Sequence, residues 1–475
     1  MERRTFIAGA AAAGTLAAVG CAVYSATADA DETRQKTSHV RSATAITQVF
    51  GDGQKLVAVA VEYDRVIDTS SLSTSTFDVS DRKVTKVYAN TKAALAEKGR
   101  DGRYVIVELS PDDKAAALWV TQQGSGTGPS DSASASSSKS STSSASSPSA
   151  SASSSGGDGV GVGGPKVGDS TPGGTIVAAK ATLTQKGTVT TADRTRYAAD
   201  STTLTTSKVI NLIVDDFKQF SYHDPATGQT LKYNLFVPKG YDPGKRYPLV
   251  LFMHDASVVN VATEGPLVQG LGAVCWASDA DQARHESFVL APEYGSVVVD
   301  DTYKPSPLFD ATANLVKAVA KKYSIDSKRL YATGQSMGAM MTVGLNIKYP
   351  DLFAASFVVA GQWPSSQAKP LAEKKLWIVV SQDDDKSYSG ENAITKVIKA
   401  EGTKVGTAVW DGQSTAAQFA ADVRGLEKQK APVNYASFQA GTTVKSGSGT
   451  SAHMGTWHIA YTIPGIRDWI MRQSG

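Results

Sequence analysis

Residues 330–341 read Leu-Tyr-Ala-Thr-Gly-Gln-Ser-Met-Gly-Ala-Met-Met, and they decide the fold. An apolar run with β character, residues 330–333, leads into a Gly-x-Ser-x-Gly pentapeptide, and a segment of helical period follows until Pro350 stops it. A serine on a tight turn from a strand to a helix needs small neighbours, because the backbones crowd one another there. The pentapeptide alone is a weak signal, and a serine in an ordinary Gly-rich loop is the competing interpretation. The strand before it and the helix after it favour Ser336 as a nucleophile.

The surrounding residues 216–475 alternate apolar strands with segments of helical spacing, which predicts an α/β fold with a mostly parallel sheet covered by helices. Strands are expected at 231–237, 248–254, 288–291, 330–333, 355–360 and 376–381, and helices at 310–323, 337–349, 391–400, 415–429 and 464–473. We expect the first two strands to pair through the turn-rich residues 238–244.

Residues 40–215 follow a different pattern, in which short β-rich runs are separated by turn-forming residues. This pattern predicts an all-β sandwich ahead of the α/β domain. Residues 122–172 interrupt it with Ser, Ala and Gly and almost no large apolar side chains, so they cannot bury enough surface to offset chain entropy. We predict that this stretch is a disordered insert in the sandwich; the alternative is a linker between two domains.

Residues 1–30 are predicted to be an export signal, because Arg3-Arg4 resembles a twin-arginine start and a short Ala/Gly-rich apolar run follows. Small residues would allow cleavage after Ala28 or Ala30. The sequence therefore predicts a secreted protein. The alternative is a lipid anchor at Cys21, where Ala-Val-Gly-Cys resembles a relaxed lipobox.

The charge balance of the 475-residue chain argues against nucleic acid as a partner. Its 48 basic and 45 acidic residues give a formal net charge of +3, with no basic stripe interleaved with aromatics. Only two cysteines occur, so no disulfide framework is expected, and Cys275 is interpreted as a small buried hydrophobe.

A serine hydroxyl needs a histidine base, which in this fold follows the serine in the order Ser, Asp/Glu, His. Of the six histidines only His453 and His458 lie after Ser336. His453 ends the Gly/Ser-rich residues 447–453 ahead of the terminal helix, and loop placement after a late strand suits the base. We predict His453 as the base and keep His458 as the alternate.

The acid is expected on the loop after the predicted strand 376–381, which runs into Gln382 and three consecutive aspartates. Successive loop residues point in different directions, so one of the three should orient the imidazole. We choose Asp384 and keep Asp383 and Asp385 as alternates. The competing interpretation is a solvated or calcium-attracting acidic turn.

Acyl transfer also needs backbone N–H groups aimed at the developing oxyanion. The amide of Met337, directly after the nucleophile, is one expected donor, and Asp255 or Ala256 is expected to supply the second from the loop after the strand 248–254. His254 lies well before the serine, so we interpret it as holding this loop and not as a catalytic residue.

Three stretches together resemble a known group of proteins: Tyr-Asn-Leu-Phe-Val-Pro at 233–238, Tyr-Pro-Leu-Val-Leu-Phe-Met-His at 247–254, and the turn around Ser336. The chain resembles, over roughly residues 230–475, the secreted esterases related to polyhydroxybutyrate depolymerases and to feruloyl and acetylxylan esterases, often labelled predicted peptidases. Some members carry an N-terminal immunoglobulin-like domain, and residues 61–79 are similar to that module. The resemblance implies a triad of Ser336, Asp384 and His453, the last supported by the trailing Trp457 and Tyr461.

Two departures from the family pattern concern the site. The family's His-Gly at the oxyanion loop is His254-Asp255 here, and its His-Gly before the acid is Val380-Ser381. A lost glycine removes access to positive φ, so we expect a displaced donor amide and a lowered activity, with an inactive relative as the extreme case.

The sequence thus predicts a serine carboxylic ester hydrolase acting on a small-molecule or polymeric ester, with no cofactor or metal. One alternative is a serine peptidase of the same fold. The other is a non-catalytic surface or carbohydrate-binding protein, whose sandwich contacts a cell surface or polysaccharide.

Overall fold

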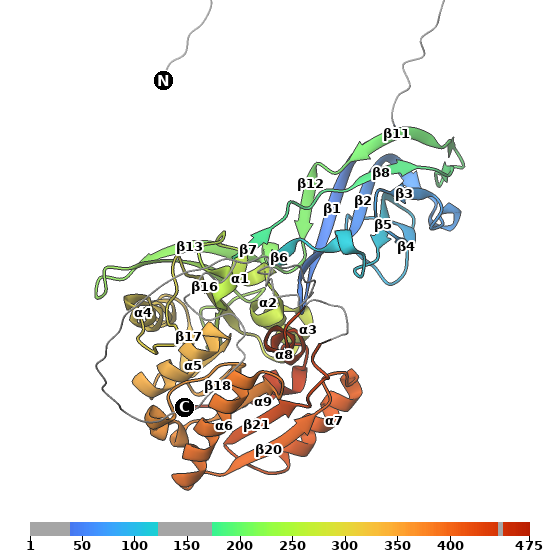
Figure 1. Ribbon diagram of the computed structural model, residues 1–475. Coiled ribbons are helices and arrows are strands. Elements are labelled where there is room, and N and C mark those ends of the chain that lie inside the picture. The colour runs from blue at the N-terminus through green and yellow to red at the C-terminus, as the bar shows by residue number, and fades with distance from the viewer. Residues whose placement is uncertain (1–38, 122–172, 445–449) are drawn as a thin grey trace, which may run out of the picture. The chain divides into compact units, whose positions relative to one another are not determined.

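The apolar run before the Ser336 turn is part of β17 (Ile325–Gln335), the central strand of a nine-stranded sheet (Figure 1). The computed structural model describes residues 39–121, 173–444 and 450–475, so the export segment, Cys21 and the predicted insert 122–172 lie outside the described residues. The sheet has the order β13-β14-β16-β15-β17-β18-β19-β21-β20. The other strands are β13 (Phe217–His223), β14 (Thr230–Phe236), β15 (Tyr247–Met253), β16 (Phe288–Glu293), β18 (Ala355–Val359), β19 (Leu376–Ser381), β20 (Val405–Trp410) and β21 (Val433–Phe438).

All pairings from β16 to β20 are parallel, and β14 is antiparallel to both of its neighbours. The predicted mostly parallel sheet is confirmed. The predicted pairing of the first two strands is wrong, because β16 lies between β14 and β15. The connection from β14 to β15 is longer than a hairpin turn, so the two strands need not be neighbours. All six residues of β16 are buried, which is typical of a strand with a neighbour on each side.

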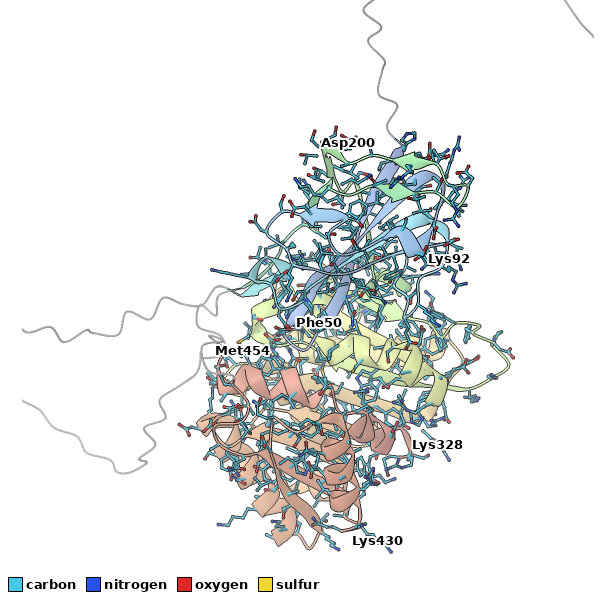
Figure 2. The ribbon with its side chains drawn as sticks, turned by 90° about the vertical axis from the view of Figure 1, so that its right-hand side faces the viewer. Phe50, Lys92, Asp200, Lys328, Lys430 and Met454 are labelled. Atoms are coloured by element: carbon cyan, nitrogen blue, oxygen red, sulfur yellow. The ribbon has the colours of Figure 1, made fainter. Side chains whose placement is uncertain are left out.

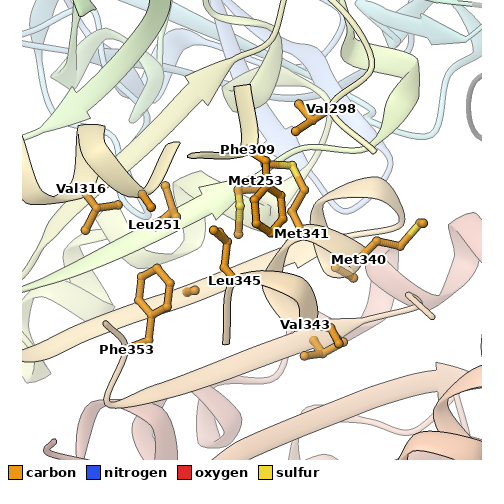
Figure 3. Packing of buried hydrophobic residues seen from close by; sticks show 14 of the residues in the cluster. Leu251, Met253, Val298, Phe309, Val316, Met340, Met341, Val343, Leu345 and Phe353 are labelled. Carbon is orange, nitrogen blue, oxygen red and sulfur yellow. The ribbon is translucent and has the colours of Figure 1, made fainter. Parts of the chain in front are cut away.

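Helices cover both faces of the sheet, and β15 shows why its sequence is apolar throughout. Leu251 and Met253 face a core formed with α4 (Pro307–Lys322), α5 (Met337–Lys348) and α6 (Asp385–Ala400), as Figure 3 shows for Phe309 and Met341. Val250 and Phe252 face the opposite core. That core is formed with α2 (Leu271–Ala277), α7 (Ala416–Glu427), α8 (Ala452–Ala460) and α9 (Pro464–Met471). Two short helices, α1 (Gly265–Val268) and α3 (Asp279–Arg284), flank α2. Within the described residues no helix combines the length and apolar character needed to cross a membrane.

The residues before the nine-stranded sheet form a β-sandwich. A five-stranded sheet has the order β12-β1-β2-β5-β4, a three-stranded sheet has the order β11-β8-β3, and β10-β9 and β6-β7 form two-stranded pairs. The strands are β1 (Val40–Phe50), β2 (Gly53–Ile67), β3 (Phe77–Val79), β4 (Val84–Asn90), β5 (Gly102–Leu109), β6 (Trp119–Thr121), β7 (Gly174–Ile176), β8 (Thr182–Gln185), β9 (Val189–Thr190), β10 (Arg196–Tyr197), β11 (Asp200–Thr205) and β12 (Lys208–Asn211). Val59, Val61 and Leu183 contribute to the core of this sandwich.

Strands from both sides of residues 122–172 meet in the sandwich. β6 and β7, which flank that stretch, pair antiparallel with each other, and β12 pairs in parallel with β1. The chain on either side of the stretch therefore belongs to one set of sheets.

Candidate active site

Ser336 lies on the turn between β17 and α5, in the unusual backbone conformation φ 52°, ψ −118°. A non-glycine residue held in such a conformation costs on the order of 1–3 kcal/mol, which the surrounding packing must impose. The two flanking glycines allow the close approach. A Cβ on Gly338 would lie 2.0 Å from the Met253 carbonyl oxygen, and one on Gly334 would lie 2.4 Å from the backbone of Gly338. The start of α5 therefore presses against the end of β15.

His453 and Asp384 complete a hydrogen-bonded chain with Ser336. Nε2 of His453 lies 2.8 Å from Oγ of Ser336, and Nδ1 lies 2.5 Å from Oδ2 of Asp384. The imidazole is packed edge to face against Trp457, with ring centroids 4.9 Å apart. The structure brings together the three residues predicted as base, acid and nucleophile, in the arrangement of a serine hydrolase triad.

The expectation that His453 lies in a loop is wrong, because it lies in the first turn of α8. Ser451 is the N-cap of this helix and accepts a hydrogen bond from the amide of Met454. The Gly/Ser-rich residues upstream suggest a loop, and the nine-residue helix is too short to show a clear period. A helical position holds the ring more firmly than a loop would.

Asp384 is buried and is the N-cap of α6, where its carboxylate accepts from the amide of Ser387. Burial opposes ionisation of Asp384, but the charge and hydrogen bond of His453, together with Ser387, outweigh it and hold the pKa of the carboxyl below its ordinary value. The acid therefore stays ionised near neutral pH and can stabilise the imidazolium that forms during catalysis.

The alternates take other positions. The carboxylate of Asp383 accepts from the amide of Gly441, and Asp385 is the exposed first residue of α6. His458 lies one turn beyond His453 on α8, where burial lowers its pKa to about 4. No group of three His, Cys, Asp or Glu residues that could hold a metal ion occurs within the described ranges.

His254 holds the loop that contains Asp255 and Ala256, the residues predicted to supply the second oxyanion donor. Its Nε2 accepts a hydrogen bond from the amide of Tyr294, so the proton is on Nδ1, which donates to the carbonyl of Asp255 at 2.7 Å. Burial lowers the pKa of His254 to about 4 and keeps the ring neutral. In a trans peptide the N–H points away from the C=O, so the amide of Ala256 points away from this imidazole. This supports Ala256 over Asp255 as the donor.

Two amides at the site are free to bind an oxyanion. Within the part of the chain that the structure describes, neither Met337 nor Ala256 donates its backbone N–H to an acceptor. Unpaired N–H groups of this kind, at the start of a helix and at a strand end, are what a developing negative charge requires.

The Asp255 substitution does not require a glycine conformation. Its φ is −79° and its ψ is 175°, an extended backbone that any residue adopts, which removes the reason for expecting a displaced amide. Its carboxylate accepts from the amide of Ser257 and from Nε2 of Gln335, each at 2.8 Å. The side chain therefore ties the oxyanion loop to the residue before the nucleophile. Val380-Ser381 is the second place where the chain differs from the family pattern. There the backbone amide of Ser381 donates to the hydroxyl of Thr456 on α8.

Sequence reasoning missed Gln335, Gln269 and Ser387. The side-chain Nε2 of Gln335 also donates to Oε1 of Gln269, at 3.2 Å. These two side chains and Asp255 therefore form one buried network behind the nucleophile. Ser387 lies three residues after Asp384. An N-cap side chain accepts from the backbone amide at this spacing, so the sequence could have indicated the contact. Gln269 has no local sequence signal.

Comparison with known proteins supports this architecture. Residues 42–198 match the family model of the esterase Ig-like N-terminal domain. Over 97 residues the chain is 32% identical to acetylxylan esterase A of Emericella nidulans and 46% identical to the probable acetylxylan esterase A of Aspergillus flavus, covering 17% of this chain and 32% of each relative. The chain thus spans about a third of the length of the curated relatives it matches.

A crystal structure of a thermostable esterase matches with a TM-score of 0.71 and 25% sequence identity, covering 92% of this chain and all of that chain. The chain therefore has a domain of the α/β-hydrolase type, preceded by an immunoglobulin-like domain of the kind found in esterases.

Proposed function

We propose that this protein is an exported serine carboxylic ester hydrolase that works through an acyl-enzyme on Ser336. The observation that carries this proposal is the continuous chain from Asp384 through His453 to Ser336, beside the unpaired amides of Met337 and Ala256. These are the groups that acyl transfer from an ester needs.

The proposed reaction proceeds in two halves. His453 removes the proton of the Ser336 hydroxyl as Oγ attacks the ester carbonyl, and the amides of Met337 and Ala256 bind the oxyanion of the tetrahedral intermediate. The intermediate collapses as His453 gives its proton to the departing alcohol, leaving an acyl group on Ser336. Water, activated by the same imidazole, then releases the acid and restores the hydroxyl. Throughout, Asp384 holds the ring and stabilises its protonated form.

Two measurements test the proposal. The protein is assayed against p-nitrophenyl esters of increasing acyl length and against peptide anilides, and a fluorophosphonate probe is applied to the wild type and to Ser336→Ala. We expect ester turnover and labelling of the wild type only. Cleavage of the anilides without the esters would replace the esterase proposal with a peptidase, and absence of labelling in both proteins would favour a non-catalytic role.

Export rests on the paired residues Arg3 and Arg4 before an apolar run. Replacing both with lysine should move the protein from the extracellular fraction to the cytoplasm of a producing bacterium with a twin-arginine pathway. Unchanged secretion of the double variant would contradict this route.

A further inference from the structure

A polar cavity of about 160 Å³ lies where the turn between β1 and β2 of the Ig-like domain meets α8 and the oxyanion loop. In Figure 2 the labelled Phe50, at the end of β1, and Met454, on α8, mark its surroundings. The lining side chains used below are Asp52 and Trp119 from the Ig-like domain, and Asp255, Gln269, Trp457 and His458 from the α/β-hydrolase domain.

The two domains are in close contact at this point. A Cβ on Gly51 would lie 2.2 Å from the carbonyl oxygen of His458, so the tip of the β1–β2 hairpin rests directly on the backbone of α8. Val49 and Trp119 belong to the same buried apolar cluster as Trp276 and Trp457. The Ig-like domain is therefore a wall of the cavity.

Three residues of the cavity wall contact His453 or the residue before Ser336. Asp255 directly precedes the donor amide of Ala256, and Asp255 and Gln269 both accept from Gln335, the residue before the nucleophile. Trp457 packs against the imidazole of His453. The cavity wall is therefore linked to the nucleophile through Gln335 and to the base through Trp457.

One lining group lacks a partner. Nε2 of Gln269 is a buried donor without a hydrogen-bond acceptor among the described residues, and the side chain is only 4% exposed. A buried amide N–H without an acceptor is costly, so this atom indicates a ligand that accepts a hydrogen bond.

The remaining walls accept hydrogen bonds or pack against rings. Asp52, with 51% of its side chain exposed and one oxygen paired with Lys55 at 2.8 Å, offers a carboxylate, and Asp255, which also accepts from Ser257 and Gln335, offers a second one. The hydroxyl group is both donor and acceptor, so it can satisfy a carboxylate and the Gln269 amide together. Trp119 and Trp457 supply flat apolar walls of the kind that suit the carbon skeleton of a polyol.

We propose that this cavity binds the hydroxyl-bearing alcohol part of an ester substrate, with Asp52 of the Ig-like domain and Gln269 as its hydrogen-bonding residues. The inference rests on the proposed ester hydrolysis. The alcohol side is assigned because the departing oxygen must lie within reach of His453, and α8, which carries His453, forms part of the cavity wall. The volume corresponds to about five water molecules, so it holds a small polyol unit and not a polymer segment.

The experiment compares two esters with the same acyl group and the same three-carbon skeleton in the alcohol part. Glyceryl monobutyrate carries two hydroxyls on its alcohol part, and propyl butyrate carries none. The measured quantity is the ratio of their kcat/KM values. The variants are Asp52→Ala and the volume-conserving Gln269→Met, and the control is Asp112→Ala, which removes an exposed carboxylate of the same domain outside the cavity.

We expect the wild type to prefer the glyceryl ester. Each cavity variant should lower the ratio about tenfold, the size of one lost hydrogen bond to a charged or buried group, mainly through KM. The Asp112→Ala ratio should stay at the wild-type value. An unchanged ratio in both cavity variants, or an equal loss on both esters, would overturn the proposal. Propyl 3-hydroxybutyrate carries its extra hydroxyl on the acyl part. If the wild type preferred this ester to propyl butyrate but did not prefer the glyceryl ester, the assignment of the cavity to the alcohol part would be overturned.

A binding measurement separates this inference from the proposed function. In the Ser336→Ala background, tryptophan fluorescence is followed during titration with glyceryl monobutyrate, because Trp119 and Trp457 line the cavity. Saturable binding that Asp52→Ala weakens would support the cavity as a polyol site even if no ester is hydrolysed. Absence of binding would overturn it even if other esters are turned over.

Discussion

The imidazole of His254 donates to the carbonyl of Asp255 at 2.7 Å and thereby sets the direction of the next amide, that of Ala256. A histidine outside the triad thus determines where the amide of the proposed oxyanion donor points. The same ring accepts from Tyr294, at the end of the neighbouring strand β16, so the loop is held from two sides.

Replacing His254 with alanine should therefore lower kcat by about 10²-fold, the effect of misaligning one oxyanion donor, with a smaller change in KM. Asn at this position offers an N–H donor near the place of Nδ1 and should recover part of the loss. Steady-state kinetics on p-nitrophenyl butyrate measures both variants. Equal activity of the alanine variant and the wild type would show that the loop holds its position without the imidazole.

Asp384→Asn should reduce kcat by about 10⁴-fold, because the amide cannot stabilise the protonated imidazole and favours the wrong tautomer. Asp383→Asn is the matched control: it removes the adjacent carboxylate, which accepts from the backbone amide of Gly441 across the loop. We expect the control to retain activity within a few fold. If the two variants exchanged these effects, Asp383 would be the acid.

Gly338→Ala should reduce both folding yield and activity, since its Cβ would lie 2.0 Å from the Met253 carbonyl oxygen and would force α5 away from β15. The control is Gly425→Ala in the exposed part of α7, where a Cβ meets nothing within 4 Å. That change should raise the free energy of unfolding by about 0.5–1 kcal/mol. Thermal unfolding followed by circular dichroism compares the two, and a stable, active Gly338→Ala protein would contradict the packing described for the turn.

Acidification should destabilise the fold through two buried histidines. Burial lowers the pKa of His254 and of His458 from 6.5 to about 4, so the unfolded chain binds more protons than the folded chain between these values. The contribution of these two histidines to stability therefore rises with pH across this window and falls as the pH drops from 6.5 towards 4, whereas the raised pKa values of the buried carboxyls of Glu391 and Glu293 act in the opposite sense. The lowered pKa of Asp384 acts only below its ordinary value of 3.8, outside the window.

The measurement is Tm as a function of pH for the wild type and His458→Gln. The variant should show a shallower decline between pH 6.5 and 4. The control is His223→Gln, which changes an exposed histidine at the end of β13 and should leave the slope unaltered. A His458→Gln curve parallel to that of the wild type would show that His458 does not contribute to the decline.

The elements that the sequence predicts well are those whose signal is local. Residues 330–333 of β17 and all of β19 are mostly apolar runs that end near chemistry-bearing residues, and the order of Ser336, the aspartates and the last two histidines can be read directly from the sequence. The position of β16 between β14 and β15 was not predictable, because strand order depends on contacts between distant segments.

The same limit applies to the site. Gln269 meets Gln335 across 66 positions of the sequence, and Gly51 meets His458 across a still longer separation. No periodicity marks either pair. At Asp255 the family glycine suggested a positive φ, whereas the backbone is extended there; the effect of the substitution on activity stays a prediction.

The antiparallel pairing of β6 with β7 bears on how the length of the chain between them can vary during evolution. These strands hold Thr121 and Gly174 about one strand spacing apart, roughly 5 Å, whatever the length of the sequence between them. The entropy of closing a loop grows only with the logarithm of its length. Residues can therefore be added to or lost from this stretch at little energetic cost, and the sandwich offers a place where a reporter or a second binding module can be grafted without moving the triad.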